Sequence, residues 1–166
     1  MLESVLARRG VSWKVKLSVK GAVSVGIIAL AVLLPQLVHL AAGQAGGVQW
    51  LPMYLPVLLG GCLLGTWWGL GVGLASPLVS FAITSALGEA MPAAARLPFM
   101  MAELAVFAAV AGLFSKKIVQ NGWLAFPAVL LAQVAGRAFF LLLVTIFQGF
   151  VPFTRAMIWS EMQPGL

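Results

Sequence analysis

The stretch Trp50–Gly69, WLPMYLPVLLGGCLLGTWWG, decides the fold of this chain. It combines two prolines and a tryptophan pair with an apolar run, and it ends in Gly-Thr-Trp-Trp-Gly. No Asp, Glu, Lys or Arg occurs anywhere between Lys20 and Glu89. Charged residues make up about a quarter of an ordinary soluble domain, so such domains rarely leave so long a span uncharged. The segment therefore indicates a chain that lies in a lipid bilayer.

The composition of the whole chain leads to the same class of protein. Of its 166 residues, 62% are hydrophobic and 8% are charged. This predicts an all-α integral membrane protein, a compact bundle of five to six transmembrane helices that uses the whole chain as one domain. We expect a basic cytoplasmic segment over 1–20, a transmembrane helical domain over 21–148, and a C-terminal tail over 149–166. The tail either lies outside the membrane or begins an incomplete sixth helix.

The basic residues predict how the bundle is oriented. Ten Lys and Arg face four Asp and Glu, and a basic group precedes the first apolar run: Arg8, Arg9, Lys14, Lys16 and Lys20. Such residues fix a cytoplasmic N-terminus and attract anionic lipid, so the excess of positive charge does not indicate nucleic acid as a partner. The apolar run over 21–42 is longer than the core of a signal peptide, and it predicts a retained first helix with a kink at Pro35. The glycine-rich segment over 43–50 is expected to be a flexible loop.

The apolar stretch Leu55–Leu87 is too long for one span. As a single helix it would measure about 50 Å, whereas the hydrocarbon core of a bilayer is about 30 Å thick. The segment Gly65–Gly69 contains glycines for a turn and tryptophans that favour the membrane interface, so it is predicted to divide the stretch into spans over 55–64 and 70–87. Further spans are expected over 97–114 and 123–147. Four spans then return Lys116 and Lys117 to the cytoplasmic side, as the positive-inside rule requires.

Two ionisable residues fall inside these spans. Glu103 is expected about 9 Å and Arg137 about 15 Å from the outer ends of their helices, at about 1.5 Å per residue. Gln133 precedes Arg137 by one turn and shares its face. Ionisable groups at such depth are costly unless they are paired or hydrated, and they usually mark a functional site. Two interpretations stay open: a polar pocket that opens outward, or an ion pair that locks two helices together.

Small residues and a few isolated polar residues have simpler explanations. Glycines recur at every fourth position over 61–73, which is typical of close helix packing. Ala22 and Gly26 are either packing residues or a smooth face on which a partner can dock. Cys62 is more typical of apolar packing than of metal ligation, and His39 has no second histidine to form a metal site with. We therefore predict no metal site.

No catalytic set is visible in the sequence. It contains no Ser-His-Asp arrangement of plausible spacing, no phosphate-binding loop with Lys, and no paired carboxylates. We therefore predict that the chain is not an enzyme and holds no cofactor. An intramembrane enzyme remains a third and weaker hypothesis.

Several short motifs, in this order and spacing, resemble the S components of energy-coupling factor transporters, the substrate-capture subunits of vitamin and micronutrient importers. The likeness extends over 32–140 and is carried by LPMYLPVLLGG at 51–61, Leu64-Gly65 with Gly69, Ser76-Pro77-Leu78, MAELA at 101–105 and Ala135-Gly136-Arg137.

The resemblance implies a six-helix fold with a substrate site on the outer side of a bacterial cytoplasmic membrane. It implies a vitamin or micronutrient as ligand, with Glu103, Arg137 and Gln133 as polar contacts and Trp50 and Tyr54 in a loop that closes over the site. It also implies a membrane coupling subunit and two ATPase subunits as partners, and these ATPases would use the ATP. Ala22 and Gly26 are then the candidates for contact with the coupling subunit.

The chain departs from that family in three respects. The alanine pair of helix one is not reproduced, Tyr54 stands where relatives often have His, and the sixth helix is missing or cut short after Pro152. The leading hypothesis is accordingly a substrate-capture membrane subunit. Its alternative is a structural or assembly subunit in which the Glu103–Arg137 pair serves only helix packing.

Overall fold

The computed structural model describes residues 12–49, 53–88, 92 and 94–147, and within them the chain is entirely helical and turn. Five helices are long and two are short. In chain order they are α2 (Trp13–Gln49), α3 (Tyr54–Leu64), α4 (Thr66–Ala86), α5 (Leu97–Leu113), α6 (Ser115–Gln120), the 3-10 helix η1 (Gly122–Leu124) and α7 (Ala125–Phe147). The all-α class predicted from composition is confirmed for this part of the chain.

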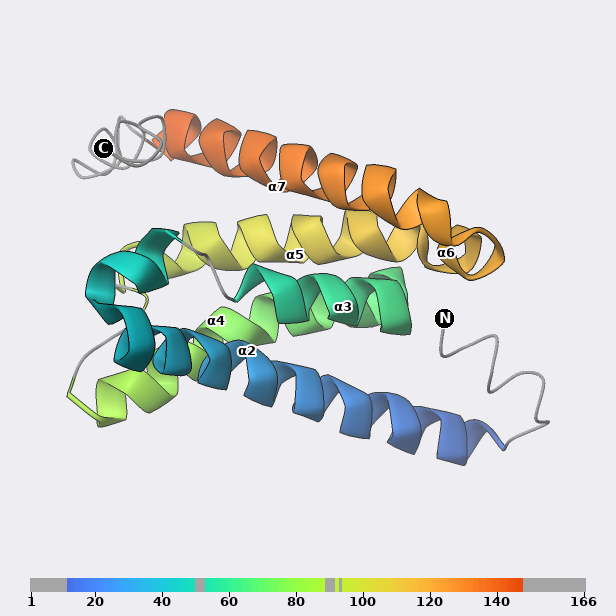
Figure 1. Ribbon diagram of the computed structural model, residues 1–166, viewed down its shortest axis with the longest axis horizontal. Helices are drawn as coiled ribbons and strands as arrows, with labels where there is room; N and C mark the ends of the chain where they lie inside the picture. Colours follow the sequence, from blue (N-terminus) through green and yellow to red (C-terminus); the bar gives the residue numbers. More distant parts are fainter. Residues whose placement is uncertain (1–11, 50–52, 89–91, 93, 148–166) are drawn as a thin grey trace.

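The long helices run side by side along the long axis of the molecule, and α5 lies at the centre (Figure 1). Helix α5 packs against α3, α4 and α7, whereas α2 packs against α3 and α4 on the far side from α7. Successive long helices run in opposite directions, so the start of α2, the α3–α4 junction and α6 share one end of the bundle (Figure 1). Lys116 and Lys117, on α6, therefore lie at the end where α2 begins, and their cytoplasmic side stays a prediction.

The predicted division of the long apolar stretch is also confirmed, but the turn is shorter than expected. Gly65 alone separates α3 from α4, with φ 87° and ψ −179°, a conformation open in practice only to glycine. Its N–H donates to the Gly61 carbonyl at 2.9 Å, and its own carbonyl accepts from the Gly69 N–H at 2.8 Å. Because one residue reverses the chain, Trp67 and Trp68 belong to the first turn of α4 rather than to a surface turn.

Glycines bring the backbones of α3, α4 and α5 into direct contact. A Cβ atom at Gly69 would lie 2.8 Å from the Gly61 Cα, and one at Gly73 would lie 2.8 Å from the Ala105 Cα. At the end of α5, a Cβ at Gly112 would lie 2.7 Å from the carbonyl carbon of Gly65. These contacts support the packing interpretation of the glycine repeat, because only residues without side chains allow helices to approach so closely.

Helix α2 differs from its predicted bounds at both ends. It begins at Trp13, inside the basic segment expected over 1–20, and it continues to Gln49. Pro35 lies within the helix, and the ribbon bends after it (Figure 1). The predicted flexible loop over 43–50 is wrong for 43–49, because glycine lowers helix propensity by only about 1 kcal/mol and does not by itself end a helix. Trp50 lies outside the described residues.

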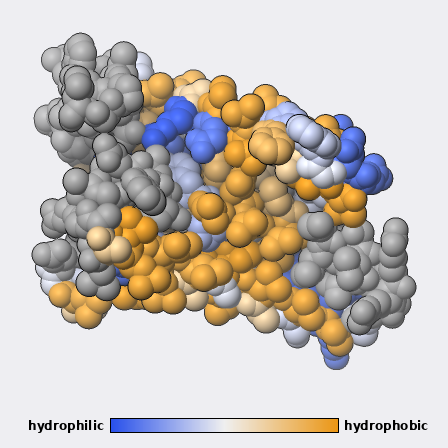
Figure 2. Space-filling model, in the orientation of Figure 1, coloured by the Kyte–Doolittle hydropathy of each residue, from blue (hydrophilic) through white to orange (hydrophobic). Residues whose placement is uncertain are grey.

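Three helical segments are long and apolar enough to cross a membrane, namely Trp13–Val38, Thr66–Ala86 and Gly122–Phe147. Helices α3 and α5 are apolar but shorter, at 11 and 17 residues. Apolar residues cover the middle of the face seen in Figure 2. By length and composition, three segments are thus candidate spans, and the expected count of five to six stays a prediction.

Two substitutions in α4 test the backbone contact. Gly73→Ala places a methyl group against the α5 backbone, so we expect it to lower the free energy of unfolding by about 1–3 kcal/mol. Gly71→Ala, two residues away, meets no atom within 4 Å and is the matched control. The control should be neutral or more stable by up to about 1 kcal/mol. Unfolding in detergent measures both variants, and equal stability of the two would contradict a glycine-dependent contact.

Candidate functional site

The polar centre of the bundle is built from three helices. Tyr54 comes from the first turn of α3, Glu103 from the second turn of α5 and Arg137 from the middle of α7. The Arg137 Nη1 atom lies 3.4 Å from Glu103 Oε1, which is an ion pair. The Arg137 guanidinium carbon also lies 5.9 Å from the centroid of the Tyr54 ring, within the range of a cation–π interaction. The ion pair, one of the two interpretations that the sequence left open, is thus present, and the pocket interpretation stays a prediction.

The Glu103 carboxylate is the most deeply buried charge in this centre. Its side chain is 2% exposed, whereas that of Arg137 is 32% exposed. The Tyr54 hydroxyl lies close enough to the carboxylate to act on it electrostatically. Oε1 accepts no hydrogen bond, and it is the only buried side-chain oxygen or nitrogen among the described residues in that condition. The Oε1 atom of the buried Glu103 carboxylate is thus held only by its electrostatic attraction to Arg137.

Buried hydroxyls elsewhere in the bundle show the contrast. Ser76 and Thr84 of α4 donate to the carbonyls of Val72 and Ser80, each at 2.7 Å, so they need no partner from another helix. Buried polar groups in native proteins are nearly always satisfied in this way. The Oε1 atom of Glu103 is therefore the place in the described bundle where an additional hydrogen-bond donor would satisfy a buried acceptor.

Aromatic and small residues hold these groups in position. Phe107 lies one turn after Glu103, and its ring meets the Tyr54 ring edge-on at a centroid distance of 5.5 Å. On α7, a Cβ at Gly136 would lie 3.3 Å from the Phe107 Cβ and 3.4 Å from the Glu103 carbonyl oxygen. Gly136 thus lets α7 approach α5 closely. Its neighbour Arg137 lies at the more exposed edge of this helix contact and reaches Glu103 from there.

A second arginine belongs to this region and was missed in the sequence. Arg96 precedes α5 and lies close enough to act electrostatically on both Glu103 and Tyr54. Its side chain is half-buried. Arg96 and Glu103 are seven residues apart, or two helical turns, and this spacing is the signal that places them on the same side of a helix.

The remaining predicted site residues are placed differently. Gln133 is exposed, although it stands one turn from Arg137. Tyr54 is a buried helical residue and not part of a closing loop, while Trp50 lies outside the described residues. Ala22 and Gly26 lie on an exposed face of α2, and a Cβ at Gly26 would meet nothing within 4 Å. Cys62 packs against the apolar core that contains Val57.

The arrangement has the groups needed to recognise a polar group. It offers a carboxylate acceptor, a guanidinium and a phenol within one apolar core, without a nucleophile–base pair among these residues. No family model, no curated protein and no solved structure matches this chain. The resemblance to S components consequently rests on the sequence motifs themselves.

The unequal burial of the pair predicts an asymmetric mutational response. Arg137→Gln leaves a buried carboxylate without its counter-ion, and breaking a buried pair in this way costs about 3–5 kcal/mol. Glu103→Gln leaves instead an arginine that is already one-third exposed, so its loss of stability should be smaller. Unfolding in detergent gives both values. A double variant more stable than Arg137→Gln alone would confirm the coupling, whereas equal losses for the two single variants would contradict it.

Proposed function

We propose that this chain is the substrate-capture membrane subunit of an ATP-driven importer of a vitamin or another micronutrient. The observation that carries the proposal is the buried Oε1 atom of Glu103, which accepts no hydrogen bond within the described bundle. A carboxylate in such an environment is costly unless it is fully paired. An N–H or O–H group of a captured molecule would supply the missing donor, next to the guanidinium of Arg137.

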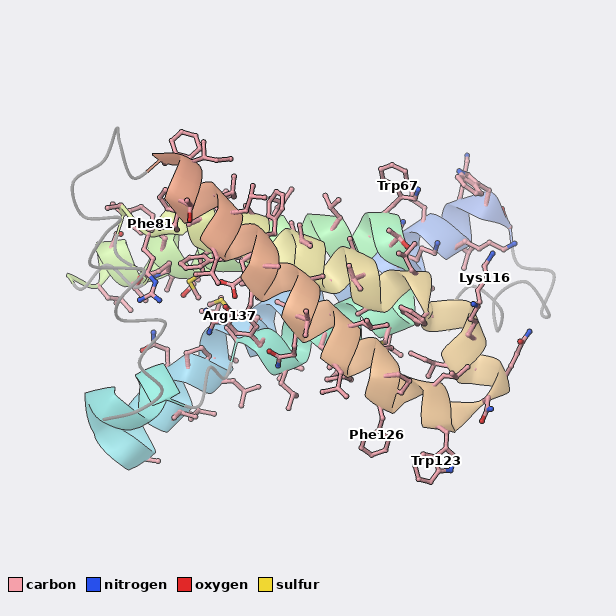
Figure 3. All side chains as sticks on the ribbon, turned by 90° about the horizontal axis from the view of Figure 1, so that it is seen from above. Trp67, Phe81, Lys116, Trp123, Phe126 and Arg137 are labelled. Carbon is pink, nitrogen blue, oxygen red and sulfur yellow. The ribbon has the colours of Figure 1, made fainter. Side chains whose placement is uncertain are left out.

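The position of the centre fits capture from outside the cell. Glu103 lies six residues from the start of α5, a depth of about 9 Å. It lies towards the end opposite Lys116 and Trp123, as the labelled Arg137 shows in Figure 3. With a cytoplasmic N-terminus, the chain is a multi-pass protein of a bacterial cytoplasmic membrane with five spans over the described residues, and this end faces outward.

The exposed face of α2 suits the proposed partners. Ala22 and Gly26 are exposed, and a Cβ at Gly26 would meet nothing within 4 Å. Small residues permit close contact between membrane helices. In the proposed complex this face meets the coupling subunit, and two ATPase subunits bind ATP. The chain itself acts without catalysis and without a cofactor.

Binding measurements on purified protein test the capture role. Mass spectrometry of small molecules retained on the wild-type chain identifies the ligand, and titration gives its affinity. We expect Glu103→Ala and Arg137→Ala each to weaken binding at least about tenfold, because hydrogen bonds to charged groups contribute about 1.5–3 kcal/mol. Gln120→Ala, exposed at the opposite end, is the matched control and should bind normally. A wild-type chain that binds no vitamin with sub-micromolar affinity would remove the basis of the proposal.

A structural or assembly subunit is the second candidate. It is favoured by the ion pair between α5 and α7 and by the packing of Tyr54 and Phe107 in the same core. The charge-swapped variant Glu103→Arg/Arg137→Glu separates the two functions. Recovery of both stability and cellular function would favour packing, whereas recovery of stability with loss of uptake would favour capture.

Cysteine labelling tests the proposed orientation. In a Cys62→Ala background, Lys14→Cys and Asn121→Cys should react with a membrane-impermeant maleimide only in inverted vesicles. Ala95→Cys, in the exposed turn before α5, should react only from outside intact cells. The prediction fails if Asn121→Cys and Ala95→Cys react from the same side.

A further inference from the structure

Exposed aromatic and basic residues gather at one end of the bundle, and we refer to them together as the cationic–aromatic rim. Its members come from the start of α2, the α3–α4 junction and the α5–α7 connection: Trp13, Lys14, Trp67, Lys116, Lys117, Trp123 and Phe126. Figure 3 shows Trp67, Lys116, Trp123 and Phe126 at the same end of the molecule. Residues more than a hundred positions apart in the sequence thus share one level of the bundle.

The aromatic members of the rim are unusually exposed. Trp13 is 77% exposed, Trp67 is 83% exposed and Trp123 is 79% exposed. These rings cover no core residue of their own chain, although Trp68, the neighbour of Trp67, packs against Ile27 and Val72. Amphipathic rings so placed are typical of the headgroup level of a bilayer, where one part of the ring meets acyl chains and the N–H meets water.

The charges of the rim have a single sign. Lys14, Lys116 and Lys117 are exposed. Within the ranges that the structure describes, the only acidic residue is Glu103, and it lies in the other half of the bundle. A binding partner that complements this end therefore carries negative charge. It also has apolar groups directly beside that charge, which cover the tryptophan rings.

The connection between α5 and α7 enlarges the rim. At the same end, Gly65 alone connects α3 to α4, so a single residue is enough to connect two antiparallel helices. The α5–α7 connection instead contains α6 and η1, with both lysines of the pair on α6. Trp123 and Phe126 follow, and their ring centroids lie 5.8 Å apart. The lysine pair therefore stands beside the largest exposed aromatic surface of the rim.

We propose that the cationic–aromatic rim binds the headgroups of anionic phospholipids, with Lys116 and Lys117 as the main contacts to the phosphate. A lipid supplies both requirements at adjacent depths: a phosphodiester for the ammonium groups, and glycerol and acyl carbons for the tryptophan rings. A lipid is favoured over a soluble partner because exposed tryptophans at the end of an apolar bundle are typical of the headgroup level of a bilayer. This site is independent of the proposed capture function, because it lies at the opposite end of the bundle.

Brominated lipids test this site through the tryptophan fluorescence of the full chain. The protein is reconstituted with brominated phosphatidylglycerol or brominated phosphatidylcholine as quencher, and the ratio of quenching gives the relative lipid affinity. The wild type should prefer phosphatidylglycerol, and Lys116→Gln/Lys117→Gln should lose about fivefold of this preference per lysine, in keeping with the usual contribution of a basic residue at an anionic surface. The matched control Lys116→Arg/Lys117→Arg keeps the charge and should keep the preference.

Circular dichroism and elution volume establish that each variant is folded before its lipid preference is compared. An equal affinity of the wild type for the two lipids would overturn the proposal. So would a full preference in the glutamine variant, or a loss of preference in the arginine variant equal to that in the glutamine variant. A preference that falls with added salt in the wild type and is flat in the glutamine variant would confirm the charge contribution.

Discussion

The backbone contact among α3, α4 and α5 is the constraint on which the rest of this bundle depends. Gly61, Gly69 and Gly73 remove side chains from the point where the three helices meet, and α5 therefore lies at the centre of the bundle instead of on its surface. Membrane helices gain little hydrophobic energy from leaving lipid for one another, so close packing has to supply the attraction. Without these glycines α5 could not take its central position.

The central position of α5 is also what creates the polar centre. Leu104 turns its backbone towards Gly73 of α4, while its neighbour Glu103 reaches towards α3 and α7. The burial of the Glu103 carboxylate is therefore a consequence of packing on adjacent residues of one helix. Tyr54 and Arg137 meet the carboxylate because α3 and α7 both pack on this helix. The same geometry is compatible with the proposed ligand capture and with helix packing, which explains why both proposals fit the site.

The features that sequence predicts well are those set by length and charge. The apolar stretch Leu55–Leu87 is longer than one span, so bilayer thickness requires a division, and the glycines and tryptophans of Gly65–Gly69 place it. The nearness of Glu103 and Arg137 follows from the cost of isolated charges in an apolar core, and an ion pair was one of the two interpretations it allowed. These predictions depend on forces that act whatever the details of packing.

The features that the sequence did not predict depend on small differences in local free energy between alternative backbone conformations and helix rotations. Glycines at 43–47 suggest a loop, but the helix of α2 continues through them because each glycine weakens it only slightly. The turn near Trp67 is shorter than predicted because a single residue with positive φ reverses the chain. Gln133 is exposed because the buried face of α7 contains Ala132 and Gly136. The rotation of a helix about its own axis, which decides the buried face, does not follow from residue spacing alone.

The single-residue link at Gly65 has a consequence for biogenesis. With 11 residues, α3 is about 16 Å long and covers only about half of the hydrocarbon layer. Such a segment is too short to be recognised as a stop during membrane insertion. We expect α3, tethered to α4 through one residue, to enter a bilayer as one arm of a helical hairpin whose longer arm provides the insertion energy. The order of synthesis then matters, because α3 emerges from the ribosome before α4 and inserts only after α4 has followed.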